Sequence, residues 1–577
     1  MAELRDFLQQ NLSGMKTERS SFDPHWRDIS DFVMPRTSRF FASDRNRGNL
    51  RNMKINDSTA TMALRTLQAG LISGVTNPAR PWIQMRTTDP DLNKWRGTRI
   101  YLDIVRDAMS EIFLKSNLYT TLPNSYSNLG GYGTDCFDLE EDEVSVVRCY
   151  SWPIGSYYLA ADHRLSVDTA YREFQMTCVQ MVRKFGLDNV SDGCRDCYQR
   201  GNYTAWFTVY HAVEQNPDFI PGGMDPRNMQ YRSIYWERGS IPEKYLRQSG
   251  YHTKPFIASR WQLTGEDIYG SSPGMDALGD VMALQLEQRR KVSVIDKHVN
   301  PPTQAPVSLE RKGVSNVPGG VTYVDAMQNG QPITPTYQTQ LSGMQYLLQD
   351  IGETQGRINT AFYRDLFLML ANSAQDSKRT AYEVARLEEE KLLALGPVYM
   401  RLNDELLDPL TTRTMQIMVD RSRPYWEGKL NGSPIIPPPP PELAGADIQF
   451  EYISTMSQAM KSVGVNAIER TMTFAGNLAQ AFPDILDNIS GDRAVRTYAD
   501  INGTPADMMV DEKQVEQVRA QRAKQAQMQQ SMAMAQQGAD AANKLANAPL
   551  SDNNALSQLL GRMQQQQQQQ QQPQGGQ

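Results

Sequence analysis

The chain has 577 residues, of which 40% are hydrophobic and 21% are charged, so it can bury a large core and should contain several modules. Its net charge of −6 excludes a tight nucleic-acid clamp, because such proteins concentrate Lys and Arg to displace the counterions around phosphate. The mean hydropathy is −0.55 and no window approaches 18 consecutive apolar residues, which argues against membrane insertion.

Helices are predicted for most of the chain up to about residue 115. The first shows one apolar face made of Phe22, Trp26, Ile29 and Phe32. The second begins at a cap formed by Asp57 and Ser58, and Asn77-Pro78 ends it. From about residue 144 to 257 the apolar period changes towards two, which predicts strands at 144–147, 157–159, 167–176, 205–213 and 233–236. The fold class is therefore α+β and mainly helical.

Two long helices with narrow apolar seams follow, at about residues 275–299 and 338–365. The first seam is Leu278, Val281, Leu284, Val292, Ile295 and Val299, interrupted by Gln288. The second seam is Leu341, Met344, Leu348, Ile351, Ile358 and Phe362, with Gln355 as its one polar member. A seam this narrow favours a partner helix, and rods of roughly 35 to 40 Å are longer than the radius of an ordinary core.

The segment between these helices cannot continue either of them. It contains Pro301, Pro302, Pro306, Gly313, Pro318, Gly319, Gly320, Gly330, Pro332 and Pro335. We therefore expect a small, separate, turn-rich module between the two rods.

After the second rod, an apolar run gives way to small polar residues before a further helix from about Thr380 to Val419, which Pro397 should bend. Five prolines, Pro437–Pro441, predict an extended polyproline II spacer and a module boundary. Beyond it the sequence is helical to about residue 530. The Gln-rich end, with nine glutamines at 564–572, has too few large apolar residues to form a core, so we expect disorder there.

Several motifs in this order resemble the portal proteins, the head-to-tail connectors of short-tailed double-stranded DNA bacteriophages. They are Pro255–Trp261 with Tyr269–Pro273, Gly70–Trp82, Gly131–Thr134, and Thr380–Pro397. The resemblance covers roughly residues 1–420, whereas about the last 130 residues carry almost none of it.

The resemblance implies a portal architecture of wing, stem, clip and crown that assembles as a ring around a central channel. Its expected parts are a wing or body at 1–271, stem helix 1 at 272–299, the clip at 300–337, stem helix 2 at 338–365, the channel loop at 366–380, a kinked wing helix and following segment at 381–436, the proline spacer at 437–441, a helical crown at 442–530, and a partly or wholly disordered Gln-rich tail at 531–577.

The resemblance also implies a function. A dodecamer at one capsid vertex would package double-stranded DNA and later release it, and the DNA would pass through without specific binding. Its partners would be the terminase large subunit, tail adaptor proteins, and the major capsid and scaffolding proteins, with no membrane. The protein would assemble in the host cytoplasm and end in the virion. Two features agree with assembly in the cytoplasm. The N-terminus lacks the basic-then-apolar pattern of a signal peptide, and five irregularly spaced cysteines favour a reducing compartment.

Basic side chains are the candidate functional residues, because ring symmetry turns one side chain into a circle of identical charges. Arg289, Arg290, Lys291 and Lys297 are expected in the stem, as charge rings or contacts between subunits. Arg311 and Lys312 are expected in the clip, where the motor or tail docks. Asn372, Gln375, Lys378 and Arg379 are expected to face DNA in the channel loop. In a monomer, the same basic residues would be ordinary surface charges.

No catalytic residue, cofactor or metal is expected. The chain has no GxxxxGK[ST], HExxH, or HxE with CxxC, and Cys194-Arg-Asp-Cys197 lacks a second ligand pair. The carboxylates from Asp138 to Glu143 could hold Mg²⁺ in a nuclease, although carboxylates before a strand are more often a solvated edge. A DNA-processing enzyme of this kind, or another tail or inner-capsid structural protein with a helical stalk, therefore stays open.

Overall fold

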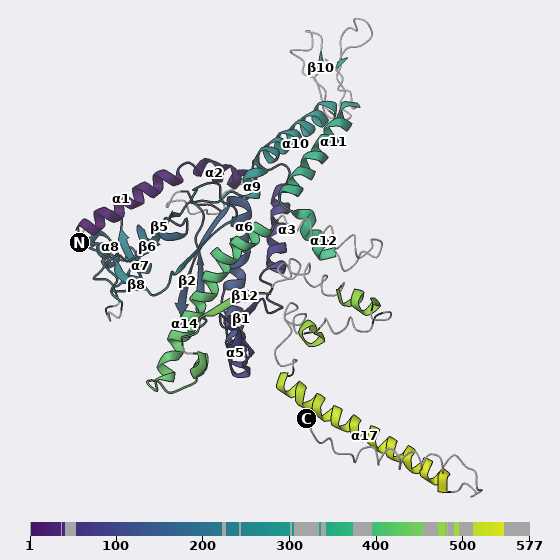
Figure 1. Cartoon of the computed structure of the whole chain (residues 1–577). Helices are drawn as coiled ribbons and strands as arrows, with labels where there is room; N and C mark the ends of the chain where they lie inside the picture. Colours follow the sequence, from purple (N-terminus) through teal and green to yellow (C-terminus); the bar gives the residue numbers. More distant parts are fainter. Residues whose placement is uncertain are drawn as a thin grey trace, which may run out of the picture. The chain divides into compact units, whose positions relative to one another are not determined.

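The structure is a computed structural model, and it describes residues 2–35, 37–40, 53–221, 225, 227–241, 244–299, 303–304, 334–335, 342–372, 395–443, 445–453, 471–478, 482, 490–495, 510 and 512–546. The chain divides into two compact units, Met1–Gly503 and Thr504–Gln577. The first unit mixes helices and strands, as the sequence predicted, and it contains the candidate site (Figure 1).

A group of helices forms the centre of the first unit. They are α2 (Asp23–Phe32), α3 (Thr59–Gly74), α5 (Arg96–Lys115) and α6 (Leu118–Tyr132). The short α4 (Pro90–Lys94) comes directly before α5. The predicted apolar face of the first is confirmed, since Trp26 and Ile29 are buried on α2. On α3, Leu64, Leu67 and Leu71 are buried, whereas Met62 is exposed. Helix α6 packs on α3 where Gly130 leaves room for two of these leucines.

Two antiparallel sheets complete the body. One has the order β4-β5-β6-β7-β8, and the other has the order β3-β2-β9. Their strands are β2 (Thr134–Asp142), β3 (Val146–Ser151), β4 (Tyr157–Ala161), β5 (Val167–Thr177), β6 (Trp206–Gln215), β7 (Tyr231–Glu237), β8 (Arg247–Tyr251) and β9 (Phe256–Arg260). Five of these match the predicted strands, whereas β2, β8 and β9 were not predicted. Two short helices, α7 (Cys178–Phe185) and α8 (Asp192–Gln199), lie between β5 and β6.

The N-terminal helix α1 (Ala2–Arg19) is fixed on the larger sheet by apolar packing and by two buried arginines. Leu8 and Leu12 belong to the same buried cluster as strand residues that include Trp236. Arg5 donates to the carbonyl of Glu237 at 3.0 Å, and Arg19 donates to the carbonyls of Gly155 and Tyr157 at 2.8 Å each. These charged hydrogen bonds satisfy carbonyl oxygens at strand ends and hold the helix in place.

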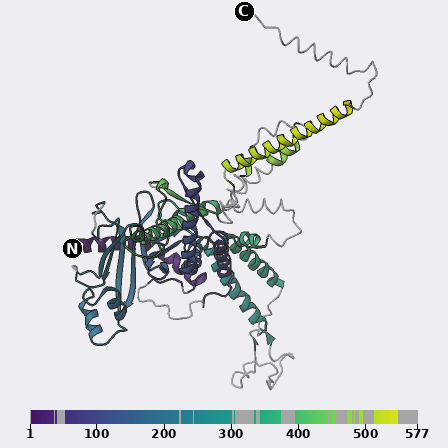
Figure 2. The same ribbon diagram turned by 90° about the horizontal axis from the view of Figure 1, so that it is seen from below.

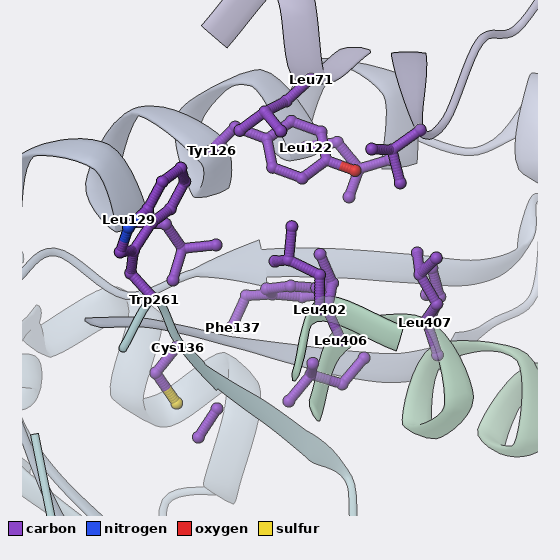
Figure 3. Packing of buried hydrophobic residues seen from close by; sticks show 14 of the residues in the cluster. Leu71, Leu122, Tyr126, Leu129, Cys136, Phe137, Trp261, Leu402, Leu406 and Leu407 are labelled. Atoms are coloured by element: carbon purple, nitrogen blue, oxygen red, sulfur yellow. The ribbon is translucent and has the colours of Figure 1, made fainter. Parts of the chain in front are cut away.

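The helix that runs past Pro397 packs against the main core of the body. Residues 395–402 are helical, a π-helical turn spans Asn403–Leu407, and α14 covers Asp408–Trp426. Leu395, Val398, Leu402 and Leu406 are buried. Figure 3 shows leucines of this segment facing Phe137 and, beyond it, Leu122 and Tyr126 of α6.

The bend expected at Pro397 stays a prediction, because this helix is described only from residue 395. Among its described residues, a departure from α-helical hydrogen bonding lies at Asn403–Leu407. The physical reason is Pro409, which has no N–H to donate to the carbonyl of Glu405. The N–H of Asp408 bonds the carbonyl of Asn403, five residues back, which is the π pattern.

The π-helical turn presents Glu405 to Arg260, in the predicted Pro255–Trp261 motif. The Arg260 guanidinium bonds Glu405 at 2.6 Å, and its backbone N–H bonds the same carboxylate at 2.9 Å. Arg260 also donates to the carbonyl of Leu165 at 2.8 Å. Because its side chain is only 3% exposed, this arginine depends on these partners for its buried charge.

The proline spacer is flanked by core residues on both sides. Ile436 and Leu443 are buried in the main core, so the run Pro437–Pro441 follows the surface of the body and does not lead away from it. Helix was expected after the spacer, yet β12 (Ile448–Tyr452) pairs antiparallel with β1 (Ile83–Thr87). The alternation of Ile448, Phe450 and Tyr452 has the period of a strand, and the backbone of β1 offers it a partner.

The second unit is described mainly by α17 (Glu512–Ala546). This helix continues past residue 530, where the sequence analysis placed the start of the Gln-rich tail. The Gln and Ala residues that dominate it are compatible with a helix, although they supply little core. Within the described residues, no helix has the length and apolar character needed to cross a membrane.

We expect Glu405→Gln to lower the free energy of unfolding by about 2–4 kcal/mol, because it leaves the buried Arg260 without its counter-charge. Glu111→Gln is the matched control, since it breaks the exposed pair with Lys115 and should cost less than about 1 kcal/mol. Urea unfolding of both variants measures the difference. Equal small losses would show that the Arg260 pair does not stabilise the body.

Candidate functional site

Two neighbouring rods leave the body, as the sequence predicted (Figures 1 and 2). The short α9 (Pro273–Asp276) leads into α10 (Leu278–Val299), and α11 (Ser342–Ala361) returns beside it. At their far ends, β10 (Thr303–Gln304) pairs with β11 (Thr334–Pro335), which brings together the two ends of the expected clip. The expected clip residues Arg311 and Lys312 lie outside the described residues.

The predicted apolar seams are buried near the body and exposed farther along the rods. Val281 and Leu284 of α10 and Ile351 and Ile358 of α11 are buried in the main core. Met344 is half-buried, whereas Leu341 lies outside the described residues. Four seam residues are largely exposed: Val292 (64%), Ile295 (41%), Val299 (77%) and Leu348 (46%). Packing between the two rods therefore covers only part of the seams within one chain.

The expected stem charges lie on the same distal part of α10. Arg289, Arg290 and Lys297 are exposed, and Lys291 is half-buried. Nearer the body, Arg357 of α11 pairs with Asp280 of α10 at 3.2 Å, which ties the two rods together at their surface.

A polar cluster joins both rods to the start of α3. The amide groups of Gln288, from α10, and Gln355, from α11, both donate to Oδ2 of Asp57, at 2.8 and 2.9 Å. The other carboxylate oxygen accepts from the N–H of Thr59 at 2.8 Å, so Asp57 also caps α3. The two glutamines that interrupt the predicted seams thus meet at one carboxylate.

A third glutamine of α10 binds the backbone of the same segment. Oε1 of Gln285 accepts from the N–H groups of Asn56 and Asp57, at 2.6 and 2.9 Å, and its amide donates to the carbonyl of Asp57 at 3.0 Å. Burial raises the pKa of Asp57, but the hydrogen bonds from Thr59, Gln355 and Gln288 outweigh it, so the pKa is lowered. The cluster therefore contains a carboxylate anion near neutral pH.

The expected channel loop begins with a helix. α12 (Arg364–Asn372) follows α11 after Tyr363, which has a positive φ of 54°, a backbone conformation that is rare for a bulky residue. Asn372 is the last residue of α12, and Gln375, Lys378 and Arg379 lie outside the described residues. The Tyr363 ring lies 6.3 Å from Trp261, so the turn packs against the Pro255–Trp261 motif.

Helix α12 packs on α3 at Gly70. A methyl group at this position would overlap the ring of Phe367, which is buried in the main core. The glycine therefore permits the close approach of α12, the helix that ends at the expected DNA-facing residue Asn372.

Two other glycine motifs, far apart in sequence, touch one another. A methyl group at Gly274 would lie 2.6 Å from the carbonyl oxygen of Gly131, and Ser272 donates to that same oxygen at 2.7 Å. Gly133 adopts a left-handed φ of 77° where α6 gives way to β2. These contacts fix the start of α10 against α6.

The acidic cluster considered for a nuclease does not converge. Asp138 is buried on β2, and burial, with the nearby Glu140, raises its pKa to about 8. Glu141 pairs with Arg421 at 2.7 Å, and Asp142 caps the β2–β3 turn through Ser145. Among the described residues, no group of three His, Cys, Asp or Glu side chains is arranged to hold a metal. Of the CxxC pair, Cys194 has its Sγ atom 3.7 Å from Sγ of Cys178, and Cys197 is half-exposed.

Comparison with known proteins gives long matches. The family model described as bacteriophage head to tail connecting protein matches residues 5–510. The portal protein of Salmonella phage epsilon15 is 44% identical over 561 residues, 97% of this chain and 98% of that protein. The probable portal protein of Bordetella phage BPP-1 is 42% identical over 555 residues, 96% and 98% of the two chains.

One solved structure, titled as the neck of an empty GTA particle computed with C6 symmetry, covers 75% of this chain and 90% of its own. Its identity is 12% and its TM-score is 0.34, so this likeness carries no structural argument.

We expect Gly70→Ala to lower the free energy of unfolding by about 1–3 kcal/mol, because the added methyl group displaces Phe367 and with it α12. Gly279→Ala is the control, since nothing lies within 4 Å of the added atom and alanine favours a helix. Urea unfolding measures both. Adding Phe367→Leu should recover part of the loss at Gly70, and strictly additive effects would contradict the proposed contact.

Proposed function

The chain belongs to the family of bacteriophage head-to-tail connecting proteins, and from this we propose that it is a portal protein that forms a ring at one capsid vertex. Double-stranded DNA enters the capsid through the ring during packaging and leaves through it during ejection. Long matches to a portal protein and a probable portal protein, each covering 96% or more of this chain, support this proposal.

The observation that carries the ring assembly is the exposure of the distal seam. Val292, Ile295 and Val299 repeat at helical spacing and stay largely exposed, although α11 lies beside α10. Burying a side chain of this size contributes about 1.5–3 kcal/mol, so these residues favour a partner. Side-by-side copies of the same rods provide one, and closure of the rotation gives a ring, which we propose is a dodecamer.

The remaining parts follow the family plan. We assign α10 and α11 to the stem, the segment between them to the clip, and α12 with the residues after it to the channel loop. Arg311 and Lys312 would dock the terminase motor or tail adaptors at the clip. The channel loop would bring Asn372, Gln375, Lys378 and Arg379 to the DNA, and Arg289, Arg290, Lys291 and Lys297 would form rings of charge or contacts between stems.

The weakly acidic composition suits passage of DNA. The net charge of −6 disfavours tight adhesion to phosphate, and a few basic rings would contact it only briefly. In this role the chain contacts the charged phosphate backbone of the duplex and does not recognise the base sequence of the DNA. The completed ring would become part of the virion, and the major capsid and scaffolding proteins would be its partners during assembly.

End-on negative-stain images of the purified full chain test the ring directly, and closed rings with a central pore are the expected result. We further expect Val292→Ser/Ile295→Ser to lower the fraction of chains in rings, because it removes apolar area that neighbours bury. Ile100→Ser, which changes an exposed apolar residue of α5, is the control and should leave the ring fraction unchanged. Unaltered ring yields in the stem variant would contradict the seam assignment.

We expect Lys378→Ala/Arg379→Ala to leave rings intact while reducing DNA packaging or retention, since these charges would contact phosphate in the channel. The measurement is packaged DNA per particle, with ring formation checked by native mass spectrometry. Arg200→Ala, at the exposed end of α8, is the control for loss of a surface charge. Wild-type packaging by the double variant would reject the loop assignment.

A further inference from the structure

The cluster around Asp57 is unusual because every stem residue in it is a glutamine. Gln285, Gln288 and Gln355 come from two helices and meet at one short segment, residues 56–57. Gln285 is only 3% exposed, so if the segment moved away its amide would lose its hydrogen bonds to the backbone of residues 56–57 and be left buried without partners. Apolar residues such as Leu284 and Ile351 flank the cluster on the same helices.

Apolar seams alone specify the relative position of two helices poorly, because a shifted pairing buries nearly the same area. A polar group inside a seam removes that freedom, since a shift leaves buried donors and acceptors unpaired. A single buried Asn has this role in coiled coils, where it selects the register at a cost in stability. At the stem base, one carboxylate accepts from both helices, so neither can slide without breaking a hydrogen bond to an anion.

We propose that Asp57 is a positioning residue that sets the register of α10 against α11 and the direction in which the stem leaves the body. Gln288 and Gln355 donate to the same oxygen of Asp57, and Gln285 bonds the backbone of that residue. Because Asp57 also caps α3, the stem is connected to the helix on which α12 packs.

In the ring, the direction of each stem relative to its body determines the angle between neighbouring subunits. The cluster therefore helps to select one subunit number, a consequence that rests on the proposed function. The register of the two helices within one chain does not depend on it, so the two can be tested apart.

The test removes the hydrogen bonds and keeps the shape. Gln288→Met/Gln355→Met replaces both amides by apolar side chains of similar length, while Asp57 keeps its cap on Thr59. Gln349→Met is the matched control, because Gln349 is an exposed glutamine of α11 that bonds only Glu353 among the described contacts. Cys197→Ser is present in all chains, since the other four cysteines are buried.

Electron–electron distances between spin labels give the first measurement. Labels at Lys297→Cys and Tyr346→Cys report the register, and labels at Glu111→Cys and Lys297→Cys report the direction of the stem. Labelled chains are diluted with unlabelled ones, so that distances within one chain dominate. We expect one narrow distribution for the wild type and the control, and a broadened or shifted one for the double Met variant. Wild-type distributions in that variant would overturn the proposal.

A second variant tests the hydrogen bond between residue 355 and Asp57 by placing a group there that donates only when it is protonated. Gln355→Glu places a second carboxyl group against Asp57, and two carboxylates in one site raise the pKa of one of them. We expect displaced distances at pH 8 that return towards wild type as the pH falls and the new carboxyl group becomes a donor. A merely structural loss would not reverse with pH, and a displacement that stays the same at low pH would count against the proposal.

Native mass spectrometry of the same chains gives the ring size. We expect one subunit number for the wild type and a spread of numbers for the double Met variant. If the wild type forms no ring, the proposed function fails, while the distance measurements still decide the role of Asp57. If the variant shows displaced distances but keeps one ring size, the link from stem direction to subunit number is wrong.

Discussion

The burial of α3 is the interaction on which the described body and stem depend. One face of this helix fits against α6, where Gly130 admits Leu64 and Leu67. Gly70 leaves room for the ring of Phe367 on α12. At the start of α3, Asp57 accepts hydrogen bonds from α10 and α11. Because interiors are close-packed and transmit small shifts, a displacement of α3 would also displace α10, α11 and α12.

Close backbone contacts explain why several motifs far apart in the sequence occur together. Gly131 touches Gly274, Trp261 packs near Tyr363, and Arg260 finds its counter-charge on the π-helical turn at Glu405. The first two contacts bring the body against the beginning of α10 and the end of α11, and the third joins β9 to the helix that runs past Pro397. The motifs that carry the family resemblance are thus largely the joints between parts, where a change of side-chain volume or charge is least tolerated.

The sequence predicted elements well where one face of an element is buried. Helices α2, α3, α10 and α11 and five strands followed from periodicity, because solvent on one side and core on the other impose a regular pattern. It failed where burial is complete or pairing is distant. Strand β2 is buried along most of its length, so it lacks alternation, and β12 is a strand only because β1 lies beside it. The π-helical turn at Asn403–Leu407 was not predicted, although Pro409 lacks the N–H that would bond the carbonyl of Glu405.

The sequence by itself determined the fold class, the two seamed rods, the broken segment between them and the family, because composition, periodicity and local motifs are properties of the chain. Only the tertiary structure decided what the polar interruptions do. Gln288 and Gln355 are separated by 66 intervening residues, and in the sequence each only interrupts an apolar seam. In the structure both amides donate to one oxygen of Asp57. Such convergence depends on how three helices pack, and no pattern along a single helix contains that information.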